Sequence, residues 1–167
     1  MKKYILYFLY FFLLFLLQVS STKVFSDYLF IIPQFVLLFV IIFALSNSFI
    51  ETLWFSFIAG FLSELFSGLF FGSQISAFLV IGLGVYLATR NLAPREITVP
   101  TVIVLVVTGT LLYELWLFVF GYLASVSGLS SALSFKYFFS TKLVWTVLLN
   151  LLFFYPLNFL FKHLPKE

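Results

Sequence analysis

The chain has 167 residues, of which 63% are hydrophobic and only 9% are charged. A soluble domain of this length has too little interior to bury so much apolar surface, so the composition excludes a soluble protein. The formal net charge of +3 comes from lysines and arginines that flank the apolar runs. That placement favours a role in membrane topology over nucleic-acid binding.

Six continuous apolar runs predict six membrane-spanning helices in one transmembrane domain. Each run approaches the roughly 20 residues that a spanning helix needs, and none alternates as the strand of a β-barrel would. Pro33 is expected in the first turn of the second span, where its missing N–H costs little. A serine-rich segment before the sixth span predicts a loop. In chain order, the predicted spans cover residues 4–19, 30–45, 50–71, 75–89, 97–123 and 137–161.

The distribution of basic residues predicts that both termini are cytoplasmic. With that orientation the inner side holds six basic residues and the outer side holds three, as the positive-inside rule favours. An alternative is a cleaved secretory signal, with Val19 and Ser21 at the cleavage site. The long aromatic run through Leu17 favours an uncleaved first span. The inner set is Lys2, Lys3, Arg90, Arg95, Lys162 and Lys166, and the outer set is Lys23, Lys136 and Lys142.

Small and polar residues lie along one side of the third predicted span. At 100° per residue they fall within an arc of roughly 160°, with Ala59 outside it and two apolar residues, Leu53 and Phe57, inside it. Most of the bulky apolar residues lie on the opposite side. Small residues let helix backbones approach closely, so this side is predicted to pack against another helix or a partner protein. The predicted packing face consists of Ser56, Gly60, Ser63, Ser67 and Gly68, and Gly72 follows at the end of the span.

Three ionisable residues lie inside predicted spans: Glu64, Glu114 and Lys142. A charged side chain at the bilayer centre costs about 2.5–3.5 kcal/mol on insertion scales, so each needs a partner, a proton or a route to the surface. Their similar depths in the outer half of the membrane suggest a shared polar cluster. The alternatives are a protonated Glu64 that only packs, and a Lys142 side chain that reaches the outer surface.

Motifs for catalysis or cofactor binding are absent from the sequence. There is no cysteine, and the single histidine, His163, lies beside lysines at a membrane exit. We therefore expect no metal, no cofactor and no enzymatic activity. A hydrolase built on Glu64 and Glu114 is conceivable, but no residues that could organise a water accompany them.

Between positions 33 and 90 the chain has a proline at the start of the second span, an acid (Glu51) at the start of the third, and Glu64 followed by the pair Ser67-Gly68. This order of residues resembles the MreD family of the bacterial rod-shape machinery. That family has a proline and an Asn or Asp at the second span, an acidic entry to the third span, and an acidic residue followed by a Ser-Gly pair. Gln34 replaces the usual Asn or Asp here, and Glu64 replaces the more usual Asp. The matching residues are Pro33, Gln34, Glu51, Ala59, Gly60, Glu64, Ser67, Gly68, Gly72 and Tyr86.

The resemblance implies a non-catalytic protein of the bacterial inner membrane that binds MreC, a bitopic membrane protein. The pair would help couple cytoplasmic MreB filaments to peptidoglycan synthesis. The resemblance also implies the six-helix architecture of the vitamin-carrier subunits of energy-coupling transporters. Two other interpretations remain: a substrate-binding subunit of such a transporter, although the first span lacks the alanines that dock its energising module, and a membrane enzyme or flippase that uses Glu64 and Glu114.

Overall fold

The computed structural model describes residues 2–25, 33–67, 71–91, 98–127 and 141–163, and every regular element in this part of the chain is an α-helix. The all-helical prediction is confirmed for these residues. Five of the helices are long and apolar enough to cross a membrane, whereas α2 has only 12 residues. The helices are α1 (Lys2–Phe25), α2 (Phe35–Ser46), α3 (Phe49–Ser67), α4 (Ser73–Asn91), α5 (Val99–Val126) and α7 (Thr141–Lys162).

Two helix ends differ from the predicted spans in ways that change the interpretation. Helix α2 begins at Phe35, so Pro33 precedes the helix instead of occupying its first turn. Gln34 is the N-cap residue, with φ −90° and ψ 71°, outside the helical region. Helix α3 ends at Ser67 rather than at Phe71, and Gly72 has a φ of 100° in the turn that follows. Glycine adopts that conformation without strain.

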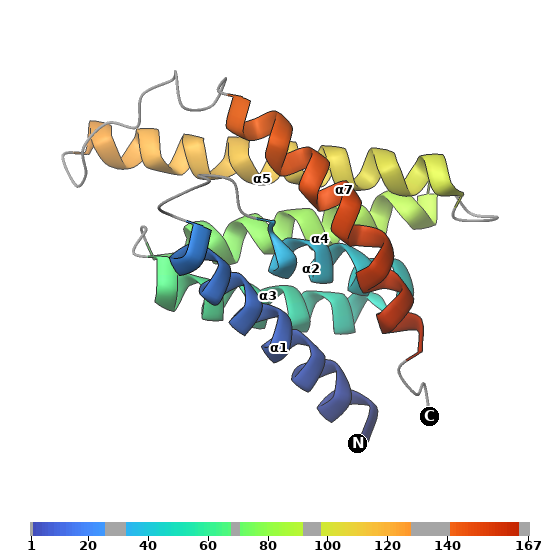
Figure 1. Cartoon of the computed structure of the whole chain (residues 1–167). Coiled ribbons are helices and arrows are strands. Elements are labelled where there is room, and N and C mark those ends of the chain that lie inside the picture. The colour runs from blue at the N-terminus through green and yellow to red at the C-terminus, as the bar shows by residue number, and fades with distance from the viewer. Residues whose placement is uncertain (1, 26–32, 68–70, 92–97, 128–140, 164–167) are drawn as a thin grey trace.

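Helix α2 forms the centre of the bundle. It contacts each of the other five described helices, and all ten residues from Phe35 to Ala44 are buried. Aromatic rings pack around it: the Phe43 and Phe55 ring centroids lie 4.2 Å apart, and the Tyr7 and Phe161 centroids lie 5.1 Å apart. In Figure 1, α2 lies between α4 above it and α3 below it, while α7 crosses in front.

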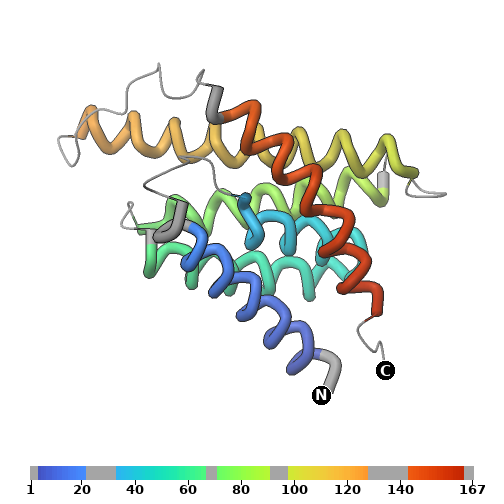
Figure 2. Tube along the Cα trace, viewed as in Figure 1, coloured from blue at the N-terminus to red at the C-terminus, as the bar shows by residue number. Residues whose placement is uncertain are grey.

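The bundle has two distinct ends. Helix α1 begins and α7 ends on the right of Figure 2, at the marks N and C. We call this the proximal end; α3 begins there too, since the Tyr4 hydroxyl donates a hydrogen bond to Glu51 at 2.8 Å. The opposite end, where α3 finishes and α4 begins, is called the distal end. Both termini thus lie at one end of the bundle, which is compatible with the predicted topology.

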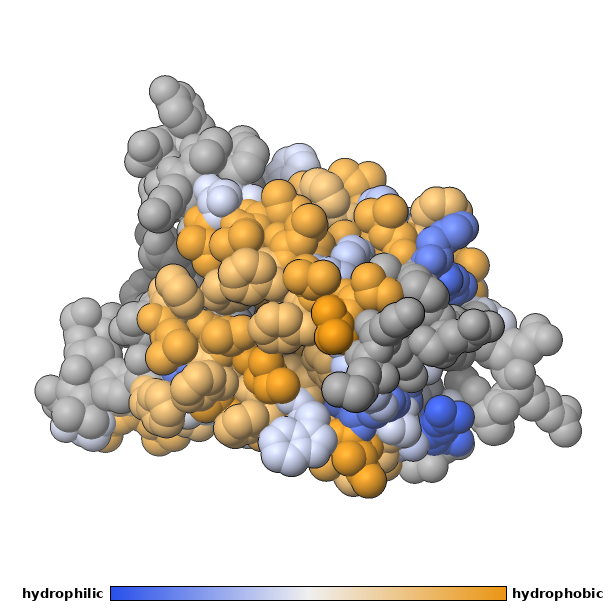
Figure 3. Space-filling model, turned by 90° about the horizontal axis from the view of Figure 1, so that it is seen from below, coloured by the Kyte–Doolittle hydropathy of each residue, from blue (hydrophilic) through white to orange (hydrophobic). Residues whose placement is uncertain are grey.

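The outer surface of the bundle is apolar, as contact with lipid requires. Large hydrophobic side chains stay exposed on all of the long helices, among them Ile5, Trp54, Leu123 and Leu152. In the view of Figure 3 most of the described surface is orange, and the strongly hydrophilic residues gather towards the right, where the proximal end lies. Helices that cross a bilayer are expected to show this distribution.

Candidate functional site: polar groups at buried helix ends

The small residues of α3 lie against α4. A Cβ atom added to Gly60 would lie 2.5 Å from the Ile75 Cα atom, and one added to Gly82 would overlap the Ser56 hydroxyl. The α3 and α4 backbones therefore approach so closely that only glycine fits at position 60, whereas a side chain at position 82 would require Ser56 to move. Ser63 is buried as well, and its hydroxyl has no hydrogen-bond partner among the described residues.

The rest of the predicted packing face is placed only in part. Gly72 lies in the turn between α3 and α4 rather than on the helix face. The side chain of Ser67, and Gly68 as a whole, lie outside the described residues. Two residues of the predicted face, Ser56 and Gly60, have α4 of the same chain as their neighbour.

Glu64 caps the N-terminus of α4. Its Oε2 accepts hydrogen bonds from the backbone N–H groups of Gln74 at 2.8 Å and Ile75 at 3.2 Å, and its Oε1 accepts one from the Ser73 hydroxyl at 3.0 Å. The first N–H groups of a helix have no partner within the helix, so a buried helix start needs acceptors of this kind. The positive end of the helix dipole also favours a carboxylate there. We call Glu64, Ser73 and Gln74 the α4 cap.

The α4 cap is tied to α5. The Tyr113 hydroxyl donates a hydrogen bond to the Gln74 side-chain oxygen at 2.7 Å, and Trp116 Nε1 donates one to the Ser76 hydroxyl at 2.9 Å. Tyr113 and Gln74 are both buried. The acid of α3 thus helps to hold α3, α4 and α5 in one register at the distal end.

A second polar group surrounds the start of α2. The Gln34 N–H donates to Asn150 Oδ1 at 2.9 Å, and the Val36 N–H donates to Gln18 Oε1 at 2.9 Å. The Gln34 amide nitrogen donates to Glu114 Oε1 at 2.6 Å. Asn150 Nδ2 then donates to Gln34 Oε1 at 3.1 Å and to Thr110 Oγ1 at 3.0 Å. We call Gln18, Gln34, Thr110, Glu114 and Asn150 the α2 collar.

The position of the α2 collar explains its polarity. Helix α2 starts level with Glu114, and α5 continues past that residue to Val126, about 18 Å at 1.5 Å per residue. The N-terminus of α2 is therefore surrounded by other helices. Where no water reaches a backbone N–H group, side chains must supply its acceptor, and α1 and α7 do so here.

The two predicted acids thus have different described partners. Glu64 bonds to α4, and Glu114 bonds to Gln34. Tyr113 brings the two groups close together, since it is adjacent to Glu114 in α5 and bonds to Gln74 of the α4 cap. Lys142 begins α7, but its side chain lies outside the described residues. A shared cluster of Glu64, Glu114 and Lys142 stays a prediction.

The remaining motif residues lie towards the proximal end. Glu51 accepts hydrogen bonds at 3.0 Å from both the N–H and the hydroxyl of Ser48, at the start of α3. This Ser-x-x-Glu arrangement is a capping box, which the sequence shows and which the sequence analysis missed. Tyr86 packs its ring on Phe49, with centroids 5.6 Å apart, and under the Arg90 guanidinium at 5.5 Å.

Gln18 and Asn150 are the other residues whose roles sequence reasoning did not predict. Asn150 follows Lys142 and Thr146 at helical spacing, which was a signal for a polar face on α7. Nothing in a single sequence pairs Asn150 with Gln34, 116 positions away. Gln18 stands alone in an apolar run and carries no motif.

The chemistry of these groups is that of helix termination and packing. Among the described residues, no group of three or more His, Cys, Asp or Glu side chains could hold a metal ion. The side chains of the α4 cap and the α2 collar accept from or donate to helix ends and neighbouring helices. These features define a small polytopic membrane protein whose buried polar residues hold its helices together.

The family of this membrane protein follows from comparison with known proteins. The family model for rod shape-determining protein MreD matches residues 2–166, so the chain belongs to the MreD family. It is accordingly a rod shape-determining membrane protein. Comparison with curated proteins and with solved structures gave no match.

Proposed function

We propose that the chain is a non-catalytic component of the cell-elongation machinery in the bacterial inner membrane. It binds an MreC-like bitopic membrane protein and helps couple MreB filaments to peptidoglycan synthesis. The family match over residues 2–166 is the observation that carries this proposal. The cytoplasmic termini and the likeness to transporter subunits belong to the same proposal.

The distribution of polar and apolar groups supports a partner that is itself a membrane helix. The described polar residues of the bundle interior serve helix ends and contacts within the chain. The small-residue side of α3 is occupied by α4. A bitopic partner would therefore contact lipid-facing apolar side chains, where close van der Waals packing drives the association of membrane helices.

Depletion of the protein in a rod-shaped host tests the proposal. Cells should widen and round when the chain is depleted, and expression of the wild-type chain should restore the original cell width. Unchanged cell width on depletion would overturn the proposal. Loss of vitamin or metal uptake on depletion, with cell width unchanged, would support the transporter alternative.

Co-purification tests the partner separately. An affinity-tagged chain, solubilised in mild detergent, should retain the MreC-like protein of the same host. A matched control is a tagged membrane protein of similar size from another family. Recovery of the ATPase module of an energy-coupling transporter, without the MreC-like protein, would contradict the proposed partner.

A further inference from the structure

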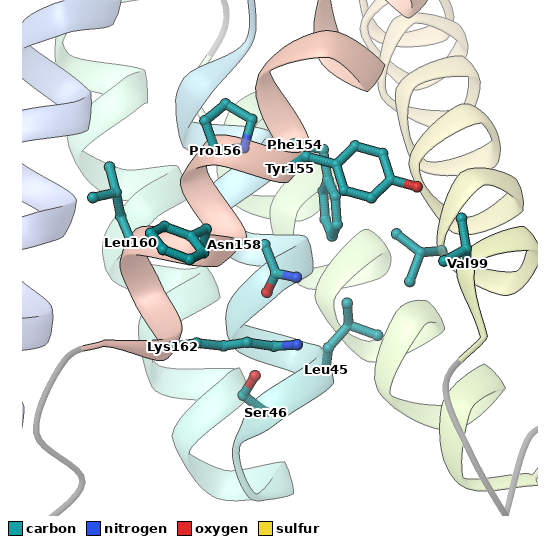
Figure 4. A pocket seen from close by; sticks show the side chains of 11 residues that line it. Leu45, Ser46, Val99, Phe154, Tyr155, Pro156, Asn158, Leu160 and Lys162 are labelled. Carbon is teal, nitrogen blue, oxygen red and sulfur yellow. The ribbon is translucent and has the colours of Figure 1, made fainter.

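A cavity of about 770 Å³ opens between three helices at the proximal end. It lies between the end of α2, the start of α5 and the second half of α7, on a side of the bundle that the α4 cap and the α2 collar do not reach (Figure 4). Its volume falls within the range of roughly 300–1,000 Å³ that is typical of small-ligand sites. None of the residues that carry the family motif lines it.

Helix α7 carries a proline beside the cavity. Pro156 lies inside α7, where it removes a backbone donor and disfavours close continuation of the helix. Helix α2 ends at Ser46, whereas α7 continues alongside it to Lys162. The space beside the end of α2 is bounded by α5 and α7, and their side chains leave it open.

The walls of the cavity are apolar and its mouth is polar. Phe154, Leu45 and Val102 form the apolar part. Asn158, Ser46 and Lys162 stand at the proximal side, and in Figure 4 the Lys162 side chain extends across the cavity towards the end of α2. No acidic residue is among the described residues that line it. An apolar chamber with one cation and two neutral hydrogen-bonding groups at its mouth matches an amphiphile with an anionic head.

We propose that this cavity is a binding site for an anionic glycerophospholipid. The acyl chain lies against Phe154 and Val102, and the phosphate binds Lys162, with Asn158 and Ser46 as further donors. Basic pockets between membrane helices on the cytoplasmic side bind anionic lipid head groups in this way. The site is independent of the proposed partner interaction, and its failure would leave the proposed function standing.

The position of the mouth supports a lipid over other occupants. Lys162 is the last residue of α7 and of its 20-residue candidate membrane span, and lipid head groups are expected at the end of such a span. Tyr155, Phe159 and Leu160 around the cavity are exposed on the lipid-facing surface. A lipid can thus enter from the bilayer without displacing any described helix.

Thermal unfolding in detergent tests the charge selectivity. The wild-type protein should gain several degrees more in Tm from phosphatidylglycerol than from phosphatidylcholine with the same acyl chains. Lys162→Gln should abolish most of that difference, with a loss of about tenfold in apparent affinity for phosphatidylglycerol, as expected for one charged hydrogen bond. Arg90→Gln is the matched control, because Arg90 is a cation of the same end that packs on Tyr86 outside the cavity.

Two results of this experiment would overturn the proposal. One is an equal response of the wild type to both lipids. The other is an equal loss in Lys162→Gln and Arg90→Gln, which would assign the effect to overall surface charge. Val102→Phe, which reduces the apolar part of the cavity, should weaken binding of phosphatidylglycerol without removing a charge.

Photocrosslinking in intact membranes identifies the occupant directly. A benzophenone amino acid at Tyr155, which is exposed and lines the cavity, should yield a phospholipid adduct detectable by mass spectrometry. A crosslink to another protein, either a partner helix or a second copy of this chain, would overturn the lipid assignment. The same probe at Trp54, outside the cavity, supplies the background of bulk lipid contact.

Discussion

Glu64 acts through its two acceptor oxygens. It lies in the last turn of α3, and it accepts three hydrogen bonds from the first residues of α4. The helix turn between them is short, so an acid at this position reaches the next helix without crossing the bundle. An acidic residue inside the membrane is by default a candidate for a functional role. In this structure Glu64 caps the N-terminus of α4.

Replacement of Glu64 should destabilise the α3–α4 pair. Glu64→Leu leaves the N–H groups of Gln74 and Ile75 without these acceptors, at an expected cost of about 1–3 kcal/mol. Glu64→Gln keeps one carbonyl oxygen and should cost less. Thermal unfolding of the purified variants checks the order. Equal stability of Glu64→Leu and the wild type would contradict the capping role.

Gly60 should tolerate no side chain at all. Gly60→Ala places a Cβ atom 2.5 Å from the Ile75 Cα atom, so α3 and α4 must separate, at an expected cost of about 1–3 kcal/mol. Gly84→Ala is the control, because Gly84 lies in α4 with open space around its Cα atom. It should be neutral or slightly stabilising, since alanine favours helix. Similar Tm values for the two variants would refute the close approach.

At the scale of the elements, α2 depends on its neighbours. Its N-terminus lies inside the bundle, and two other helices supply acceptors to its first N–H groups. Gly109 of α5 packs on it as well, since a Cβ there would lie 3.0 Å from the Ile41 side chain. A 12-residue helix so enclosed is held by side-chain contacts rather than by its own length.

The α2 collar should behave as one unit. In a double-mutant cycle, Gln34→Ala and Asn150→Ala should each destabilise the protein, and the double variant should cost less than the sum. The expected coupling is about 0.5–2 kcal/mol, because Asn150 Nδ2 donates to the Gln34 side-chain oxygen, a bond that either substitution removes. Chemical or thermal unfolding in detergent measures it. Strict additivity would show that the two side chains do not act together.

The sequence predicted the helices better than their ends. Apolar runs mark where chain can lie in lipid, so the described helices overlap the six predicted spans. Hydropathy cannot show that α2 begins only at Phe35, after Pro33, or that α3 ends at Ser67, since apolar residues lie on both sides of these points. Glu64 and Glu114 could be identified from the sequence because an acidic residue stands out in an apolar run. Their hydrogen-bond partners could not, because those depend on how the helices pack against one another.

At the scale of the whole molecule, basic residues, the start of α1 and the end of α7 lie together at the proximal end. Arg90 lies in the last turn of α4 and Lys162 ends α7, at the end of the bundle where α1 and α3 begin. If this end is cytoplasmic, the basic residues follow the positive-inside rule. The apolar surface between the two ends then spans the bilayer.

The absence of cysteine makes this topology directly testable. Single-cysteine variants His163→Cys and Ser127→Cys place thiols at exposed positions at opposite ends of the bundle. In intact cells, a membrane-impermeant maleimide should label Ser127→Cys and spare His163→Cys. Permeabilised cells, in which both should react, are the control. Labelling of His163→Cys alone in intact cells would invert the assigned orientation.

The enclosure of α2 also bears on how the protein is made. At about 18 Å, the helix is shorter than the roughly 30 Å hydrocarbon layer, so it could not rest stably in lipid by itself. During biosynthesis it must be sheltered by other helices soon after it leaves the insertion machinery. Among the hydrogen-bond partners of its N-terminal turn, which are Gln18, Glu114 and Asn150, the α7 residue Asn150 is synthesised last. The N-terminal turn of α2 therefore reaches its final bonding only when nearly the whole chain has been synthesised.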